Sequence, residues 1–294
     1  MKKVRPLILD WLRCVAGCLA RCPGGAVLLS LAYFLLCQWR EGRSAGVFWG
    51  GKSWYRVEPK VLIALGPLFP LGTGIAGYGL PNGEEIFGPR RKWWFRHYQP
   101  MEGDKILDIG AGMGEDTWVF SHAVGEGGRV IAVEAHPTTC QILRDFIRYN
   151  RLTNVDSFFG AVSDNSGHAI ITDRPMSDWQ LNSVSFGLNA SPVAGTRVPA
   201  FRLDDLESAM GFSRIAFIKM NIEGAEGLAL KGARFTLSKT QHICVCCHDF
   251  LGPATETKAE VCQLLRACGF DLFFTDAASP PYERDFVYGK RTSP

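Results

Sequence analysis

The sequence has little charge and lacks the cysteine patterns of cross-linked or zinc-binding domains. Charged residues make up 21% of its 294 residues, apolar residues make up 47%, and the net charge is +3. This apolar composition excludes a disordered chain, and so small a net charge gives no support for a nucleic-acid partner. The ten cysteines include no CxxC pair and show no disulfide framework. Unpaired cysteines among apolar residues fit a reducing compartment.

The charge that is present is unevenly distributed. The first 52 residues contain eight basic and two acidic residues, whereas the remainder carries a small negative charge. Within the basic part, residues 22–39 (CPGGAVLLSLAYFLLCQW) are 18 uncharged residues in a row. As a helix they would span about 27 Å, slightly less than a bilayer core of about 30 Å. We therefore predict that residues 1–45 form a hydrophobic helical arm that associates with a membrane.

Residues 46–102 are predicted to form a connecting or lid region. Their uncharged stretch, residues 61–83, is rich in proline and glycine, which favours irregular or hairpin structure over a membrane span. Residues 89–98 (PRRKWWFRHY) interleave basic and aromatic side chains. This pattern suits phosphate binding with base stacking, a lipid headgroup surface, or a short helix whose aromatic side chains pack on the next domain.

Residues 103–294 alternate between predicted strands and helices. Apolar strands are expected at 105–109, 129–134, 156–160, 215–220 and 243–247, with a closing antiparallel pair at 271–275 and 286–289. Helices are expected between them, at 116–123, 137–150, 203–210, 224–233 and 255–268. This alternation predicts an α/β domain whose mostly parallel sheet carries helices on both faces. Ligands of such sheets bind at the carboxyl ends of the strands.

A glycine-rich turn follows the first of these strands. Gly110, Gly112 and Gly114 allow a tight turn and a close approach of a ligand to the backbone. The dinucleotide fingerprint needs a glycine where this chain has Glu115, and an acidic residue there opposes a pyrophosphate. A zwitterionic sulfonium ligand would meet no such repulsion, and Asp108 could accept from its ammonium group. Glu134, at the end of the next strand, can hold both hydroxyls of a ribose.

These residues resemble a known family. The block Lys219–Glu226 (KMNIEGAE), with the glycine turn and the segment Val133–Pro137 (VEAHP), is similar to the FkbM family of class I methyltransferases, whose block reads K-x-D-x-E-G-x-E. The resemblance covers roughly residues 103–275. It implies a Rossmann-like fold with a seven-stranded sheet. It also implies S-adenosylmethionine as cosubstrate and O-methylation of a hydroxyl on a sugar or polyketide-like acceptor.

The resemblance also implies roles for single residues. It assigns the methionine part of the cosubstrate to Asp108, Gly110 and Gly112, the ribose to Glu134, and the border of the adenine to residues between Ala161 and Asp164. It places Lys219, Asn221 and Glu223 beside the transferring methyl group.

One position departs from the family pattern, because Asn221 stands where the family has an acid. An amide orients a hydroxyl but takes no proton, so the base would be Glu223 or His248, or the substrate needs none. We assign no metal, although Glu223, Asn221 and Asp249 could together hold a divalent cation.

The need for a cytosolic cosubstrate restricts how the N-terminal arm can associate with a membrane. The positive-inside bias places the N-terminus in the cytoplasm, and a single span would then export the catalytic domain. A re-entrant hairpin or a helix lying in the interface keeps that domain on the cytoplasmic side. The acceptor is then a small molecule or a glycolipid at the membrane surface. The alternatives are a nucleotide-binding oxidoreductase, a membrane-docked binding protein with altered activity, and an RNA methyltransferase. The sequence leaves the oligomeric state open.

Overall fold

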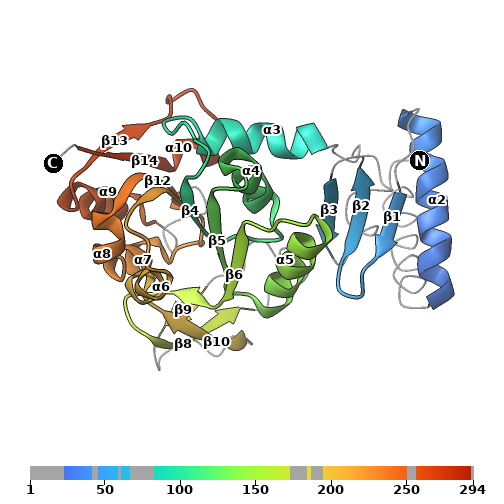
Figure 1. Cartoon of the computed structure of the whole chain (residues 1–294), viewed down its shortest axis with the longest axis horizontal. Coiled ribbons are helices and arrows are strands. Elements are labelled where there is room, and N and C mark those ends of the chain that lie inside the picture. Colours follow the sequence, from blue (N-terminus) through green and yellow to red (C-terminus); the bar gives the residue numbers. More distant parts are fainter. Residues whose placement is uncertain are drawn as a thin grey trace, which may run out of the picture. The chain divides into compact units, whose positions relative to one another are not determined.

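A computed structural model describes residues 23–41, 46–58, 61–66, 83–172, 184–186, 195–249 and 256–292. The chain divides into two compact units (Figure 1). The first reaches to Gly88 and includes Arg148–Asn150, and the second holds the rest from Pro89 onward. The predicted divisions at 45/46 and 102/103 are therefore not where these two units part.

The first unit combines one helix with a small antiparallel sheet. Helix α2 (Pro23–Glu41) is followed by β1 (Gly46–Trp49), β2 (Trp54–Glu58) and β3 (Val61–Gly66), in the order β1-β2-β3. Ala26 and Leu29 of α2 pack against Val47 and Trp54 of the sheet. Residues 1–22 of the predicted arm and most of the stretch 61–83 lie outside the described residues. None of the helices in the described ranges is long and apolar enough to cross a membrane.

The second unit is built on a seven-stranded sheet with the order β13-β14-β12-β11-β4-β5-β6. Its strands are β4 (Lys105–Ile109), β5 (Arg129–Glu134), β6 (Val155–Phe159), β11 (Ile215–Met220), β12 (Thr240–Cys246), β13 (Phe270–Phe274) and β14 (Phe286–Arg291). The first five are parallel, and β14 runs antiparallel to both of its neighbours. The seven-stranded, mostly parallel sheet and its antiparallel closing pair are confirmed.

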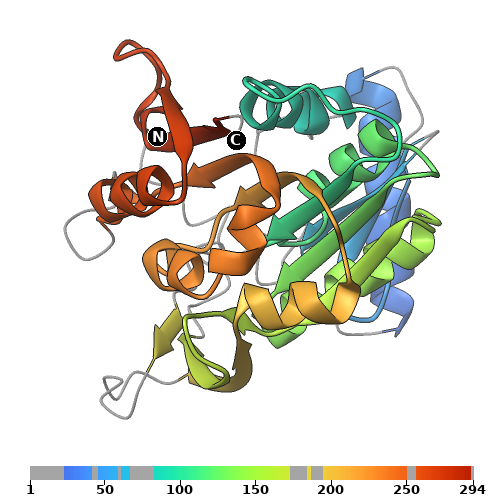
Figure 2. The same ribbon diagram turned by 60° about the vertical axis from the view of Figure 1, so that its left-hand side comes forward.

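Helices cover both faces of this sheet (Figure 2). They are α3 (Gly83–Trp94), which begins in the first unit, α4 (Glu115–Val124), α5 (Pro137–Tyr149), α6 (Leu203–Met210), α7 (Glu226–Lys231), α8 (Arg234–Ser238), α9 (Lys258–Ala267) and α10 (Pro281–Arg284). Alternate residues of a strand point to opposite faces. Leu107 and Ile109 of β4 therefore join the apolar core under α6 to α9. Ile106 and Asp108 belong to the other face, which is also fully buried.

A second, four-stranded sheet is inserted between β6 and β11. It contains β7 (Ala161–Val162), β8 (Gly167–Thr172), β9 (Val184–Phe186) and β10 (Gly195–Phe201), in the order β7-β10-β8-β9. Ala161, Ala169 and Val198 form a small apolar core within it. Because β7 follows β6 after Gly160 alone, this insertion begins at the carboxyl end of the main sheet.

The segment 89–98 packs its aromatic side chains on the main sheet of the unit to which it belongs. Trp94 is buried and stacks on Phe286 of β14, with ring centroids 5.2 Å apart. Tyr98 stacks on Phe217 of β11 at 4.7 Å. Of the three interpretations of this segment, the structure shows packing of its aromatic side chains on the sheet that follows it in the chain.

Candidate active site

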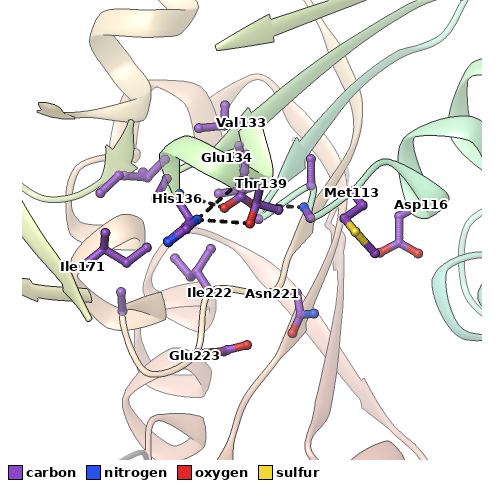
Figure 3. A pocket seen from close by; sticks show the side chains of 18 of the residues that line it. Met113, Asp116, Val133, Glu134, His136, Thr139, Ile171, Asn221, Ile222 and Glu223 are labelled. Atoms are coloured by element: carbon purple, nitrogen blue, oxygen red, sulfur yellow. Dashed lines mark hydrogen bonds between the residues drawn. The ribbon is translucent and has the colours of Figure 1, made fainter. Parts of the chain in front are cut away.

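A cavity of about 360 Å³ opens at the carboxyl ends of β4, β5, β11 and β12. Its wall comes from the glycine turn after β4, the end of β5, the start of β7, and the segments that follow β11 and β12. Figure 3 shows Glu134 and His136 on one side of the cavity, and Asn221 and Glu223 on the other. All of its lining residues belong to the second unit.

The glycine turn shapes one wall through backbone geometry that a side chain would prevent. Gly110 has φ of +76°, and a Cβ added there would lie 2.0 Å from the backbone oxygen of Asn221. Gly112 has φ of +59° but faces open space, because nothing lies within 4 Å of the position of its Cβ. The first glycine therefore permits close packing of two loops, and the second leaves room for a ligand against the backbone.

Glu134 is held in place by the backbone on both sides of it. Its Oε2 accepts from the Gly112 amide at 3.0 Å, and its Oε1 accepts from the His136 amide at 2.8 Å. Burial raises the pKa of this carboxyl, and the two amide hydrogen bonds oppose the rise. Each carboxylate oxygen can accept more than one hydrogen bond, so both oxygens can still bind a ligand hydroxyl.

Asp108 and Lys219 do not line the cavity. Both are fully buried, and Lys219 Nζ lies 2.9 Å from Asp108 Oδ1. The two residues are direct partners in the register of β4 and β11, on the face opposite the α6–α9 core. Asp108 also accepts from Thr117 Oγ1 at 2.6 Å, and Lys219 donates to the Gly110 carbonyl at 2.6 Å. Lys219 was expected beside the transferring methyl group and Asp108 beside the methionine part. The structure instead places them in an ion pair behind the glycine turn.

The electrostatics of this pair extend to Asp116, whose Oδ2 lies 3.3 Å from Lys219 Nζ. Burial disfavours the charged form of Lys219, but the nearby carboxylates of Asp108 and Asp116 outweigh it and raise its pKa. Burial also raises the pKa of Asp108, and the charge of Lys219 opposes this rise. A lysine held in this way links β11 to β4 and holds the glycine turn that follows β4 through the carbonyl of Gly110.

Asn221, Glu223 and His248 all line the cavity at the ends of β11 and β12. Asn221 Oδ1 is buried and accepts no hydrogen bond from the residues that the structure describes. Glu223 has φ of +52°, a left-handed conformation that costs free energy for any residue except glycine. Backbone strain of this kind is concentrated at functional sites. Here the strained residue carries a carboxylate and lies in the wall of the cavity.

His248 has an acidic partner at the start of α7. Its Nδ1 lies 3.0 Å from Oε1 of Glu226, the first residue of α7, and both side chains are buried. The sequence comparison included Glu226 in the family block but gave it no role.

The segment predicted to border the adenine is divided by the structure. Ala161 lines the cavity together with Gly160, Val162 and Ile171. Asp164 does not line it, and its Oδ1 accepts from the side chains of Ser163 and Asn165. An apolar wall beside Glu134 suits a planar aromatic base next to a ribose.

Several residues that line the cavity were not predicted as site residues, above all Arg90 of α3, although the basic and aromatic segment 89–98 that contains it stood out in the sequence. Arg90 Nε lies 3.2 Å from Asp116 Oδ1, which also accepts from Trp94 Nε1 at 2.7 Å. Helix α3 lies before the region of family resemblance, so only the fold brings Arg90 to the cavity. Asp116, which follows the glycine turn, was the one signal in the sequence that a basic side chain would pair there.

No group of three or more metal-ligating side chains occurs within the described ranges. Asp249, considered as a third ligand beside Glu223 and Asn221, directs Oδ1 to the backbone amides of Thr257 and Lys258.

Comparison with known proteins agrees with this geometry. A family model described as the methyltransferase FkbM domain matches residues 108–272, which is more than half of the chain. The chain is 26% identical over 152 residues to the ubiquinone/menaquinone biosynthesis C-methyltransferase UbiE of Shewanella sp. strain W3-18-1, covering 50% of this chain and 56% of the relative. It is 31% identical over 119 residues to the UbiE of Hydrogenovibrio crunogenus, covering 39% of this chain and 44% of that one. The matches span about half the length of these relatives or less.

Similar solved structures include an O-methyltransferase from Bacillus cereus in complex with SAH, with a TM-score of 0.43 and 14% identity. That match covers 71% of this chain and 80% of the other. Another is Aeropyrum pernix fibrillarin with natively bound S-adenosyl-L-methionine, with a TM-score of 0.38 and 16% identity over 64% of this chain and 66% of that one.

Proposed function

This chain belongs to the FkbM methyltransferase family and uses S-adenosylmethionine, and from that premise we propose that it methylates the oxygen of a hydroxyl group. The observation that carries the proposal is the arrangement across one cavity. Glu134 stands at one side, and Asn221, Glu223 and His248 stand at the other. Membership of a methyltransferase family does not support the oxidoreductase alternative.

The cosubstrate side of the cavity fits S-adenosylmethionine. Glu134 accepts the two ribose hydroxyls through oxygens that Gly112 and His136 already fix in position. The open space beside Gly112 admits the methionine part, and the apolar wall at Ala161 and Ile171 receives the adenine. S-adenosylmethionine supplies a methyl group on a positively charged sulfonium, which is a good leaving group.

The protein then has two tasks at the acceptor side, to align the hydroxyl and to remove its proton. The side-chain amide NH2 of Asn221 donates to the acceptor oxygen and so directs it toward the methyl carbon, which leaves the hydroxyl proton available to a base. An amide cannot take the proton, so that task belongs to Glu223 or His248. Such alignment and proton transfer each account for large parts of the rate of a displacement reaction.

The test is product analysis with isotope-labelled S-adenosylmethionine. Purified protein is incubated with membrane-lipid fractions and with soluble extract, and the labelled product is examined by NMR for a methyl group on oxygen or on carbon. We expect label on oxygen, and none with Glu134→Ala. Label on carbon would contradict the O-methylation proposal, and it is the outcome that the names of the UbiE relatives suggest.

We extend the proposal to an acceptor at an anionic membrane surface, with the catalytic unit on the cytoplasmic side. Four apolar residues of α2 are more than half exposed, and they are Val27, Leu28, Leu31 and Leu35. Their spacing puts them on one side of the helix. The first 52 residues carry eight basic side chains against two acidic ones. An apolar helical face with basic neighbours is typical of helices that lie in the membrane interface.

Vesicle flotation tests this extension with the full chain. We expect the protein to float with vesicles of phosphatidylglycerol and phosphatidylcholine, and far less with phosphatidylcholine alone. The double variant Leu28→Ser/Leu31→Ser should lose this association. Val57→Ser changes an exposed apolar residue of β2 and serves as the control. Equal flotation of all three proteins would refute a role for α2.

A further inference from the structure

Glu226 is a fully buried carboxylate beside the cavity, at 0% exposure. Burying an ionised carboxylate is costly unless hydrogen bonds compensate. Here the Gly224 amide donates to both carboxylate oxygens, at 3.2 and 3.0 Å, and His248 Nδ1 lies 3.0 Å from Oε1. The Gly224 contact fixes Glu226 to the same loop that carries the strained Glu223. The carboxylate is therefore held in place by the Gly224 amide, and its Oε1 also accepts from His248.

This contact determines which nitrogen of His248 can act as a base. A ring nitrogen beside a carboxylate carries the proton, because the carboxylate only accepts. Neutral His248 therefore has its proton on Nδ1, and the basic lone pair is on Nε2. His248 lines the cavity with Asn221 and Glu223. Any proton that His248 takes from an acceptor must go to Nε2.

Other titratable groups lie near His248 in the chain or in the cavity. They are Glu223, which lines the same cavity, Asp249, next in the chain, and the thiols of Cys246 and Cys247. Burial raises the pKa of both thiols, so they are neutral at physiological pH. Asp249 caps the backbone amides before α9. Glu226 accepts a hydrogen bond directly from the imidazole ring of His248.

We propose that Glu226 is a positioning residue that holds His248 with Nε2 toward the acceptor, so that His248 is the general base of the methyl transfer. This inference rests on the proposed function. As the acceptor oxygen forms its bond to the methyl carbon, the carbon–sulfur bond breaks and the sulfonium becomes a neutral thioether. The hydroxyl proton passes to Nε2, and Glu226 stabilises the imidazolium that results. Water then takes the proton from Nε2.

The first test is an NMR measurement of the ring nitrogens of histidine-labelled protein, which needs no acceptor. The chain has six histidines, and the signal of His248 is the one missing in His248→Asn. We expect nitrogen shifts of the Nδ1–H tautomer in the wild type. Glu226→Gln should give a mixture of the two tautomers, because an amide can donate to Nδ1 as well as accept from it. The Nε2–H tautomer in the wild type, or an unchanged tautomer in the variant, would overturn the proposal.

The second test compares kcat and KM with the acceptor found by product analysis. Glu226→Gln should lower kcat about 10²-fold or more, with little change in KM for S-adenosylmethionine. Glu226→Asp should recover part of the rate. The control is Glu207→Gln, which removes another buried carboxylate, paired with Lys239 at 2.9 Å and outside the cavity. That variant should lose stability but keep kcat.

The outcomes separate the two proposals. If the wild type methylates no hydroxyl while Glu226→Gln still changes the tautomer of His248, the proposed function fails and the contact stands. If hydroxyl methylation occurs and Glu226→Gln leaves kcat unchanged, the positioning role is wrong. If Glu226→Gln does not fold, the tautomer of His248 in the wild type still decides.

Discussion

Lys219 and Asn221 lie two residues apart at the end of β11, yet they belong to different environments. Lys219 is buried in an ion pair with Asp108 on one face of the sheet, whereas Asn221 lines the cavity opposite Glu134. The family block makes both look like parts of one catalytic cluster. The structure separates a charged pair that holds the glycine turn from polar groups that face a ligand. Proximity in a motif therefore does not establish a shared role.

Among the substitutions that test this difference between Lys219 and Asn221, Lys219→Met should have the largest effect, a loss of unfolding free energy. This substitution leaves the buried carboxylate of Asp108 without its cation, whereas Asp116 keeps its ion pair with Arg90. Breaking a buried pair on one side costs about 3–5 kcal/mol of unfolding free energy. Urea unfolding measures this loss, and Asp108→Asn added to Lys219→Met should recover part of it. A loss below about 1 kcal/mol would show that the pair has little structural importance.

On the cavity side, acid should weaken cosubstrate binding through Glu134. Burial raises the pKa of this carboxyl, so it is protonated at a higher pH than an ordinary glutamate. A protonated carboxyl accepts hydroxyls poorly, so affinity for S-adenosylhomocysteine falls as pH drops through that raised pKa. We expect about a tenfold loss for each pH unit below it. Calorimetry from neutral to acid pH measures this, and Glu134→Gln should remove the pH dependence. A persistent acid limb in that variant would assign it to another group.

A smaller effect is expected from Asn221→Asp, which restores the acid of the family pattern. If His248 is the base, a carboxylate at position 221 adds no needed function, and kcat should change by less than about threefold, equivalent to about 0.7 kcal/mol. Initial rates with the identified acceptor measure this change. Activity that appears only in the variant would instead favour the interpretation of the natural chain as a binding protein.

The smallest effect is expected from Asp164→Asn, because Asp164 does not line the cavity. Its affinity for S-adenosylhomocysteine should stay within about twofold, which is less than 0.5 kcal/mol. Ala161→Phe, three residues earlier and on the cavity wall, should bind far more weakly because the larger side chain fills the adenine space. Competition binding compares the two variants. Equal loss in both would contradict the division of this segment.

The strands and the mostly parallel character of the sheet could be predicted from sequence, because buried parallel strands are short apolar runs, as in Arg129–Glu134 and Ile215–Met220. The cavity position followed from the rule on strand ends. Glu134 and Asn221 lie where that rule puts them. The pairing partners of individual charged residues could not be predicted, because they depend on which strands are neighbours and in which register they pair.

Pairing Asp108 with Lys219 required knowing that β4 and β11 are neighbours in that alignment. Placing Arg90 required the packing of α3, which no local pattern encodes. The link between His248 and Glu226 joins a strand end to a helix start, and it is visible only in three dimensions.

The central claim is that this cavity binds the S-adenosyl group through Glu134. Calorimetric titration of S-adenosylhomocysteine into the wild type and Glu134→Ala at neutral pH tests it most directly, with NAD titrated in parallel. We predict saturable binding of S-adenosylhomocysteine to the wild type and no binding of NAD. In Glu134→Ala the affinity for S-adenosylhomocysteine should fall about 100-fold or more, because two hydrogen bonds to a charged group are worth about 3 kcal/mol or more. Equal affinity of the two proteins for S-adenosylhomocysteine, or binding of NAD alone, would contradict the account.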